Sequence, residues 1–334
     1  MQFLRRFAPL ARQRLWQGAL TLAAVIIFNF VLVHLAPGSP VDVLAGEAGT
    51  SDPARAAALI KEFGLDKSLP SQFLDYVSNL GRLNLGYSYR DSQPVLDLIL
   101  TRLPATLLLM TCAIVLSLAA GILIGVTAAW RVNTPIDQAS SFLATLCYAT
   151  PMFWSGLMLI TIFSVKLGWL PSDGMRTVTF DEQNAFALVL DVARHLVLPT
   201  TSLALFYIAI YSRIMRASML EVSRLDFIRA ARARGLSSTA VYYRHALRNA
   251  LLPVTTMAGV QIASMLGGSV IVETTYGWPG LGRLSFEAVT RRDYNLMMAI
   301  LLISAVIVIV VNLLMDVLYC LIDPRIKHGT EEGR

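Results

Sequence analysis

The strongest constraint on the fold is a series of long apolar runs without charged side chains, such as the one between Arg102 and Arg131. A transmembrane helix needs about 20 consecutive apolar residues. In lipid, every backbone polar group must be satisfied within the spanning structure, which favours α-helices. Charged residues make up 15% of the chain and hydrophobic residues 55%, whereas soluble domains carry roughly 25% charged residues. The sequence therefore predicts an all-α polytopic membrane protein.

The apolar runs predict six transmembrane helices, with both termini on the same side of the membrane. The predicted spans are residues 15–36, 104–130, 138–165, 195–212, 251–272 and 294–320. Eight arginines and only two acids, Glu221 and Asp226, lie between Arg213 and Arg248. Short Arg-rich loops are retained in the cytoplasm. We therefore predict a cytoplasmic loop at 213–250, cytoplasmic termini at 1–14 and 326–334, an extracytoplasmic segment at 37–102 and a transmembrane core at 103–325.

The first apolar run has some features of a signal peptide, because Arg5, Arg6, Arg12 and Arg14 precede it. Its apolar part covers residues 16–35, which is longer than the about 7–15 residues of a typical signal peptide. We therefore predict an uncleaved first span. The net charge is +6. Arginines beside the spans account for this charge and orient the chain in the lipid membrane, so we predict no nucleic-acid partner.

The basic loop has the local signals of two short helices. Residues 227–233 are rich in Ala and Arg, which are good helix formers. Gly235 is placed to end that helix in a left-handed turn, and Ser237 or Ser238 can cap a second helix. We predict that this second helix runs toward Asn249 and stops near Pro253.

The motif Arg229-Ala230-Ala231-x-x-x-Gly235 resembles the Glu-Ala-Ala-x-x-x-Gly loop of the permease subunits of bacterial ABC importers. Arg229 stands where the general motif has Glu, and Leu252-Pro253 comes five residues later than strict spacing predicts. The resemblance implies a coupling helix that docks on an ATPase subunit. The residues that it places in this coupling loop are Asp226, Arg229, Ala230, Ala231, Arg234, Gly235 and His245. The simpler alternative is a basic hairpin that only touches anionic lipid.

Further motifs are similar to those of the dipeptide/oligopeptide branch of that family. Within this branch they resemble the first of the two membrane subunits. The most specific is Glu273-Thr-Thr-Tyr276-Gly277-Trp278-Pro279-Gly280-Leu281-Gly282, whose Pro and Gly residues predict a tight turn at the outer face. The others are Pro37-Gly38-Ser39-Pro40, Gly64-Leu65-Asp66, Gln72-Phe73, Leu85-Gly86-Tyr87-Ser88, Pro94-Val95, Pro151-x-Phe153, Asn312-x-x-x-Asp316 and Asp323-Pro324-Arg325. The resemblance covers the chain from Pro37 to Arg325.

Several polar, aromatic or helix-breaking residues within or just after the spans are candidates for a gate or pathway. They are Asn29, Pro151, Phe153, Glu273, Trp278, Pro279 and Asp316. Pro151 predicts a kink in the third span, because proline removes a backbone donor. Asn29 either lines a pathway or makes a helix–helix hydrogen bond. Glu273 is either paired or faces a watery vestibule, and Asp316 either pairs with a loop arginine or relays protons.

No pattern in the sequence supports catalysis. The chain lacks a Gly-x-x-x-x-Gly-Lys-Ser/Thr phosphate loop and the His-Glu-x-x-His and Gly-x-Ser-x-Gly motifs. Its four histidines are scattered and Cys112, Cys147 and Cys320 lack paired spacing, so we predict neither a metal site nor a disulfide. We expect the chain to bind no cofactor, with ATP and Mg held by partner subunits.

These features favour a permease for small peptides, driven by a partner ATPase, because the span centres lack the ionisable groups of gradient-driven carriers. The resemblance implies four kinds of partner: a second homologous permease, two ATPase subunits, an extracytoplasmic binding protein and the peptide itself. The alternative within the same architecture is import of nickel, glutathione or another small solute. Alternatives of other classes are an intramembrane hydrolase and a non-transport scaffold.

Overall fold

A computed structural model describes residues 2–35, 67–88, 90–177 and 185–322, with side chains from Leu15 to Met315 within those ranges. The chain divides into two compact units, and each is described by itself. The first unit combines Met1–Pro104 with Leu284–Leu313, and the second combines Ala105–Arg283 with Leu314–Arg334. The sequence motifs at residues 37–40, 64–66 and 323–325 lie outside the described residues.

The all-α membrane fold is confirmed: among the described residues, five helices are long and apolar enough to span a membrane, and a bent helix pair makes up to six. The single spanning helices are α1 (Gln2–Leu35), α5 (Val95–Trp130), α8 (Ala185–Val222), α11 (Leu247–Thr275) and α13 (Tyr294–Ile322). The bent pair consists of α6 (Pro135–Ala149) and α7 (Met152–Leu159), which the π-helical segment η1 (Ile160–Lys166) extends. A shorter helix, α12, covers Leu281–Arg291.

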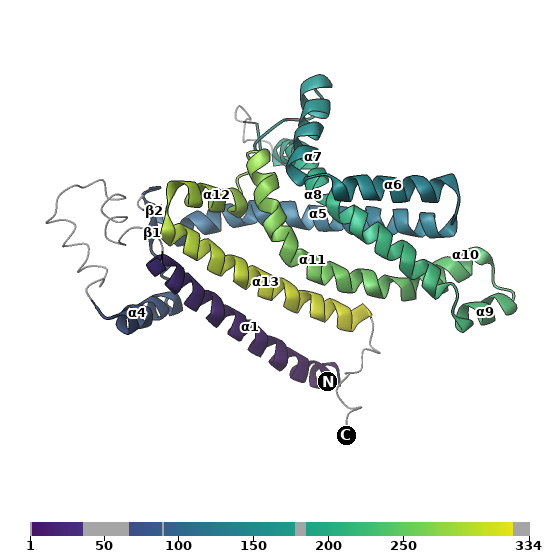
Figure 1. The fold of residues 1–334 in the computed structure, drawn as a ribbon, viewed down its shortest axis with the longest axis horizontal. Coiled ribbons are helices and arrows are strands. Elements are labelled where there is room, and N and C mark those ends of the chain that lie inside the picture. Colours follow the sequence, from purple (N-terminus) through teal and green to yellow (C-terminus); the bar gives the residue numbers. More distant parts are fainter. Residues whose placement is uncertain (1, 36–66, 89, 178–184, 323–334) are drawn as a thin grey trace. The chain divides into compact units, whose positions relative to one another are not determined.

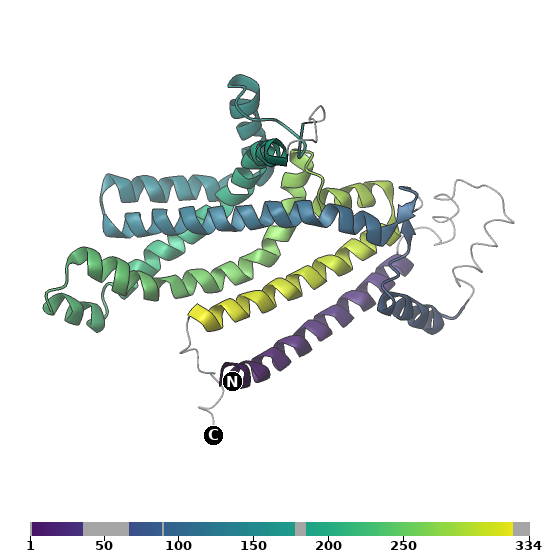
Figure 2. The same cartoon turned by 180° about the vertical axis from the view of Figure 1, so that it is seen from behind.

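In the first unit, α1 and α13 lie side by side (Figures 1 and 2). The Asn29 side chain is buried and its Nδ2 donates to the carbonyl of Met298 at 3.0 Å. Helix α4 (Leu69–Gly81) has a proline in its first turn, where no helical hydrogen bond is lost. Asn29 is therefore a helix–helix contact in this unit.

A short β-hairpin connects two of the sequence motifs, Leu85-Gly86-Tyr87-Ser88 and Pro94-Val95. Strand β1 (Tyr87–Ser88) pairs antiparallel with β2 (Gln93–Pro94). The Ser88 hydroxyl donates to Asp293 Oδ2 at 2.5 Å, and the other Asp293 oxygen accepts from the backbone of Leu296 at 3.0 Å. Asp293 thus caps the start of α13 and fixes the hairpin beside it.

In the second unit, α5 and α8 approach so closely that side chains do not fit between them. A Cβ at Gly121 would lie 2.7 Å from the Cβ of Tyr211, and one at Gly125 would lie 2.6 Å from the Ser212 carbonyl oxygen. Small residues four apart allow membrane helices to make such contacts. Gly121 and Gly125 therefore permit the close contact between α5 and α8.

The third predicted span is broken rather than kinked. Helices α6 and α7 meet at 107° across Thr150 and Pro151, and Thr150 is extended with ψ 127. The ring of a proline pushes the preceding residue out of the helical region. Pro151 therefore ends one helix and starts another, so the bend predicted at this proline is a complete break between two helices.

Helix α8 is longer than the span predicted for it. Helix α8 begins at Ala185 instead of near residue 195 and ends at Val222 instead of near 212. The predicted boundaries were set at the first charged residues, but helical hydrogen bonding continues beyond the apolar part of a span. Much of the predicted loop at 213–250 is therefore helical.

Candidate functional site

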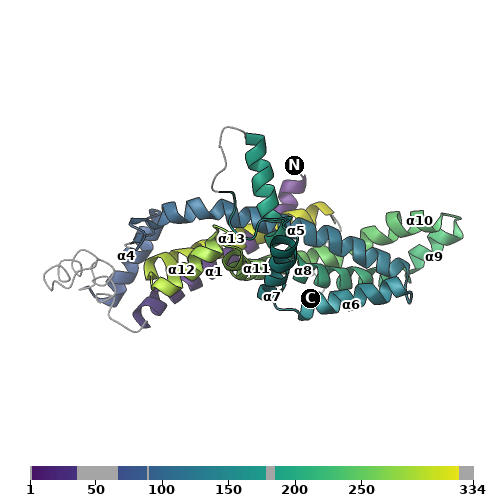
Figure 3. The same cartoon turned by 90° about the horizontal axis from the view of Figure 1, so that it is seen from above.

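The basic loop forms a helical hairpin, defined here as residues 226–246, at one end of the second unit (Figure 3). Its first helix, α9 (Asp226–Ala233), buries Ile228 and Ala231 on one face. The turn that follows contains Gly235 at φ +79, with open space around the position of a Cβ. Glycine is required there by backbone conformation and not by crowding. The predicted left-handed turn is confirmed.

The second arm of the hairpin starts at Ser237, whose side chain accepts from the Ala240 backbone at 3.3 Å. It continues through α10 (Ser238–Ala240) and the π-helical η2 (Val241–Ala246) directly into α11. The predicted stop near Pro253 is wrong, because Pro253 lies inside α11. A proline costs one backbone hydrogen bond, and membrane helices tolerate this when the apolar sequence continues.

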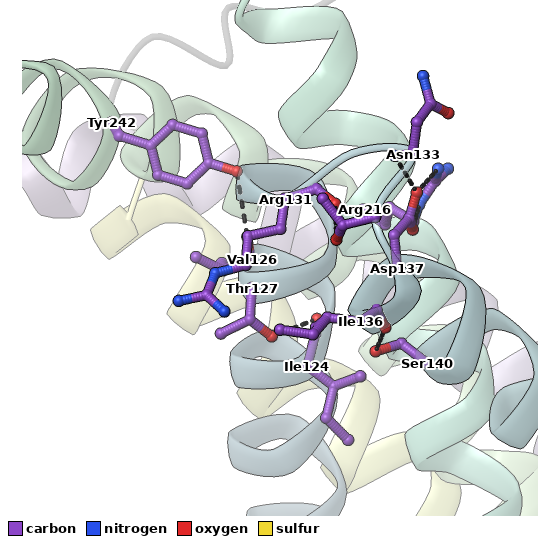
Figure 4. Close-up of polar contacts among 11 residues, drawn as sticks. Ile124, Val126, Thr127, Arg131, Asn133, Ile136, Asp137, Ser140, Arg216 and Tyr242 are labelled. Carbon is purple, nitrogen blue, oxygen red and sulfur yellow. Dashed lines mark hydrogen bonds and ion pairs between the residues drawn. The ribbon is translucent and has the colours of Figure 1, made fainter.

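The hairpin is attached to the end of α5 by aromatic side chains. The buried Tyr242 hydroxyl donates to the Val126 carbonyl at 3.1 Å (Figure 4). Trp130 packs edge-on against Tyr242 at 4.4 Å between ring centroids and stacks on Tyr243 at 5.9 Å. These contacts hold the hairpin against the transmembrane helices.

An ion pair joins α6 to α8 close to the hairpin (Figure 4). Arg216 Nε lies 2.5 Å from Asp137 Oδ1 and Arg216 Nη2 lies 2.7 Å from Asp137 Oδ2. The Asn133 backbone donates to the same Oδ2 at 3.0 Å. Asp137 is 3% exposed and sits in the first turn of α6, where the helix dipole favours an anion. A planar guanidinium matches a carboxylate in this two-bond geometry.

Sequence reasoning missed this pair. One signal was present, because Asp137 is the only acid between Asp97 and Asp173. Its partner could not be chosen from eight arginines in the loop region without the packing of α6 on α8.

The exposed face of the hairpin combines positive charge with apolar surface. The Arg229 side chain is 73% exposed and its contact with Asp226 is 3.4 Å long. Ala230, Arg232 and Arg234 are also exposed, and His245 is half-buried. The larger apolar side chains on the outside are Leu225, Phe227, Leu236 and Tyr243. This face can bind an acidic protein surface that has an apolar centre.

A second polar cluster lies at the other end of α11, where Glu273 is fully buried. The Thr106 hydroxyl donates to Glu273 Oε1 at 2.7 Å, and the Arg283 backbone donates to Oε2 at 2.9 Å. The Leu281 backbone in turn donates to Thr106 Oγ1 at 2.7 Å. We call Thr106, Glu273, Trp278 and Gly280 the outer cluster. Glu273, predicted to be either paired or facing a watery vestibule, is buried and accepts hydrogen bonds from these neutral donors.

The residues after Glu273 are packed on it. Trp278 is fully buried and donates from Nε1 to the Ala105 carbonyl at 2.9 Å. A Cβ at Gly280 would overlap Glu273 Cδ and Thr106 Oγ1, and Pro279 is half-buried. Glu273 and Trp278, predicted as gate or pathway candidates, thus anchor a tight turn here.

The other predicted candidates are not gathered into one site. Pro151 lies at the helix break and Phe153, just after it, is 53% exposed. Asn29 belongs to the first unit. Asp316 lies in α13, but its side chain lies outside the described residues.

Comparison with known proteins gives one consistent family. Residues 121–328 match the binding-protein-dependent transport system inner membrane component model, and residues 7–110 match its N-terminal membrane component. The di/tripeptide transport system permease protein DppB of Pseudomonas aeruginosa (strain UCBPP-PA14) is 41% identical, over 92% of this chain and 95% of that protein. The oligopeptide transport system permease protein AppB of Bacillus subtilis (strain 168) is 41% identical with the same coverage.

A solved structure shows the same fold. The MetNI methionine ABC transporter in an inward-facing conformation aligns with a TM-score of 0.52 at 17% identity, over 68% of this chain and 96% of that chain. Together with the family match over most of the helices described above, this defines the class of the protein. The chain belongs to the inner membrane components of binding-protein-dependent transport systems, the permease subunits of ABC transporters.

Proposed function

We propose that this chain is the first membrane subunit of an ATP-driven importer of small peptides in the bacterial inner membrane. An extracytoplasmic binding protein delivers the peptide, a second homologous permease completes the pathway, and two ATPase subunits hold ATP and Mg. The peptide assignment follows relatives that are named as dipeptide and oligopeptide permeases. In this proposal both termini and the hairpin are cytoplasmic.

The observation that carries the proposal is the hairpin itself. It is packed on α5 through Tyr242, yet its arginine face is open. A surface that is both attached to the transmembrane helices and free to bind is what an external ATPase needs in order to move them. Closure of the ATPase pair on ATP then acts on α8 and α11, which enter and leave the hairpin.

Reversal of charge on the hairpin tests the docking role. We expect Arg229→Glu with Arg232→Glu to weaken binding of the purified ATPase subunits about tenfold, because an acidic surface on the ATPase would then meet acidic side chains on the hairpin. Arg82→Glu, on the predicted extracytoplasmic segment, is the control and is expected to bind the ATPase normally. Unchanged ATPase affinity in the double variant, with altered binding to anionic vesicles, would instead support a hairpin that only touches lipid.

Uptake by the assembled importer tests the function as a whole. Proteoliposomes that contain this chain, its partner permease and both ATPase subunits are expected to accumulate labelled dipeptide only with ATP and the binding protein. Uptake by this chain alone would contradict the proposal. Calorimetry of the binding protein with peptides and with Ni²⁺ separates peptide from nickel as cargo.

A further inference from the structure

We propose that Asp137 and Arg216 are positioning residues that make α6 and α8 one rigid helix pair, through which movement of the hairpin reaches the helix break at Thr150 and Pro151. This inference rests on the proposed function, since it needs an ATPase that moves the hairpin. It assigns a transmission role to residues outside both the hairpin and the outer cluster.

The first step is the strength and geometry of the ion pair. Two parallel hydrogen bonds, at 2.5 and 2.7 Å, fix both the distance and the rotation between the two side chains. The backbone of Asn133, in the turn between α5 and α6, holds the same carboxylate. The pair therefore ties α8 to both the start of α6 and the turn before it.

The second step is that contacts continue along the same two helices. Arg213 Nη2 donates to Thr145 Oγ1 at 2.8 Å, and the Arg213 guanidinium lies over the ring of Tyr148 at 5.6 Å. Tyr148 stacks on Phe206 at 5.1 Å between centroids. The contact between α6 and α8 thus extends from the first turn of α6 to its last, which ends at Ala149.

The third step connects the helix pair to the hairpin. Helix α8 is continuous to Val222, and α9 begins at Asp226. Three residues of chain leave little slack between them, so a displacement of α9 acts directly on the end of α8. Arg216 lies in the last two turns of α8, close to this junction.

The fourth step is the position of the break. Helix α7, beyond Pro151, packs on α11 as well as on α8, and the Tyr276 hydroxyl donates to the Gly156 carbonyl at 3.1 Å. Helix α6 packs on α8, whereas α7 also has this anchor on α11, and the extended Thr150 between them forms a hinge. Turning of the α6–α8 pair is then expressed at this break.

The test compares transport with hydrolysis in the assembled importer. Arg216→Lys keeps the charge but loses the two-bond fork, and Asp137→Asn keeps the shape but loses the charge. In both variants we expect ATP hydrolysis to remain stimulated by the binding protein, while peptide uptake per ATP falls about tenfold. Arg131→Lys is the matched control, at an exposed arginine next to the same turn, and is expected to keep wild-type coupling.

A second measurement does not depend on those variants. Spin labels at Ala139→Cys on α6 and Ala217→Cys on α8, both exposed positions, report the separation of the helices in a chain whose native cysteines are replaced. We expect the same separation in the nucleotide-free and ATP-bound importer. A separation that changes with ATP, or wild-type uptake per ATP in both charge variants, would overturn the inference. Lack of ATP-dependent uptake by the wild-type importer would instead overturn the proposed function.

Discussion

Two of the carboxylates buried in the second unit are satisfied in different ways. Asp137, beside the hairpin, is held by a guanidinium from another helix. Glu273, in the outer cluster, is held by the Thr106 hydroxyl and by the backbone of Arg283, both neutral donors. The first arrangement joins two long helices side by side. The second folds a short turn tightly around one side chain.

The two regions differ in how tightly they are packed. A Cβ at Gly280 or Gly282 would overlap neighbouring atoms, and Trp278 is fully buried. On the hairpin, the Arg229 side chain is 73% exposed and a Cβ at Gly235 would meet no atom within 4 Å. We therefore expect substitutions in the outer cluster to act through stability and substitutions in the hairpin to act through coupling.

The largest effect is expected at Gly280. Gly280→Ala places a methyl group on Glu273 Cδ and Thr106 Oγ1, and overpacking of this kind costs about 1–3 kcal/mol. We expect a lower yield of folded protein and a lower thermal unfolding midpoint in detergent. Gly267→Ala is the control, because a Cβ there meets no atom within 4 Å. Equal midpoints for the two variants would show that the outer turn can rearrange.

The next effect is expected at Gly235, and it should spare folding. Gly235→Pro cannot adopt φ +79, because the proline ring holds φ near about −65°. We expect a protein that inserts and purifies normally but hydrolyses ATP without peptide uptake. Gly235→Asn is the control, since asparagine tolerates positive φ, and should transport. Normal uptake by the proline variant would refute the coupling role of this turn.

The smallest effect is expected at Tyr242. Tyr242→Phe keeps the ring packed on Trp130 but removes the hydrogen bond to the Val126 carbonyl, which is worth about 1 kcal/mol. We expect a small drop in the unfolding midpoint and a moderate loss of uptake per ATP. Tyr243→Phe, at a half-exposed tyrosine, should change neither. If the two variants behave alike, the hairpin is held by ring packing alone.

The hairpin could be predicted from the sequence because its determinants are local. Gly235 and Ser237 act on residues three or fewer positions away, through backbone conformation and capping. The prediction was wrong at Pro253, where the helix continues. The apolar run to Val272 stabilises the helix more than the loss of one backbone hydrogen-bond donor destabilises it.

Asp137 and Glu273 show the opposite case, because their hydrogen-bond partners are far away in the sequence. Asp137 and Arg216 are 79 positions apart, and Thr106 and Glu273 are 167 apart. Nothing local selects Thr106 over the other hydroxyls of the chain. Glu273 was recognised as notable because it ends an apolar run, but its partners depend on how α5 and α11 pack.

The sequence by itself determined that this chain crosses a membrane and carries a basic helical hairpin, because a bilayer demands long uncharged runs and short helices follow local rules. The tertiary structure alone decided which polar atoms meet: Asp137 with Arg216, Thr106 with Glu273, and Tyr242 with Val126. It also decided that the helix is broken at Pro151, where the sequence predicts a kink. The physical reason is that apolar side chains set how far a helix extends in lipid, whereas hydrogen bonds between distant segments form only after the helices have packed.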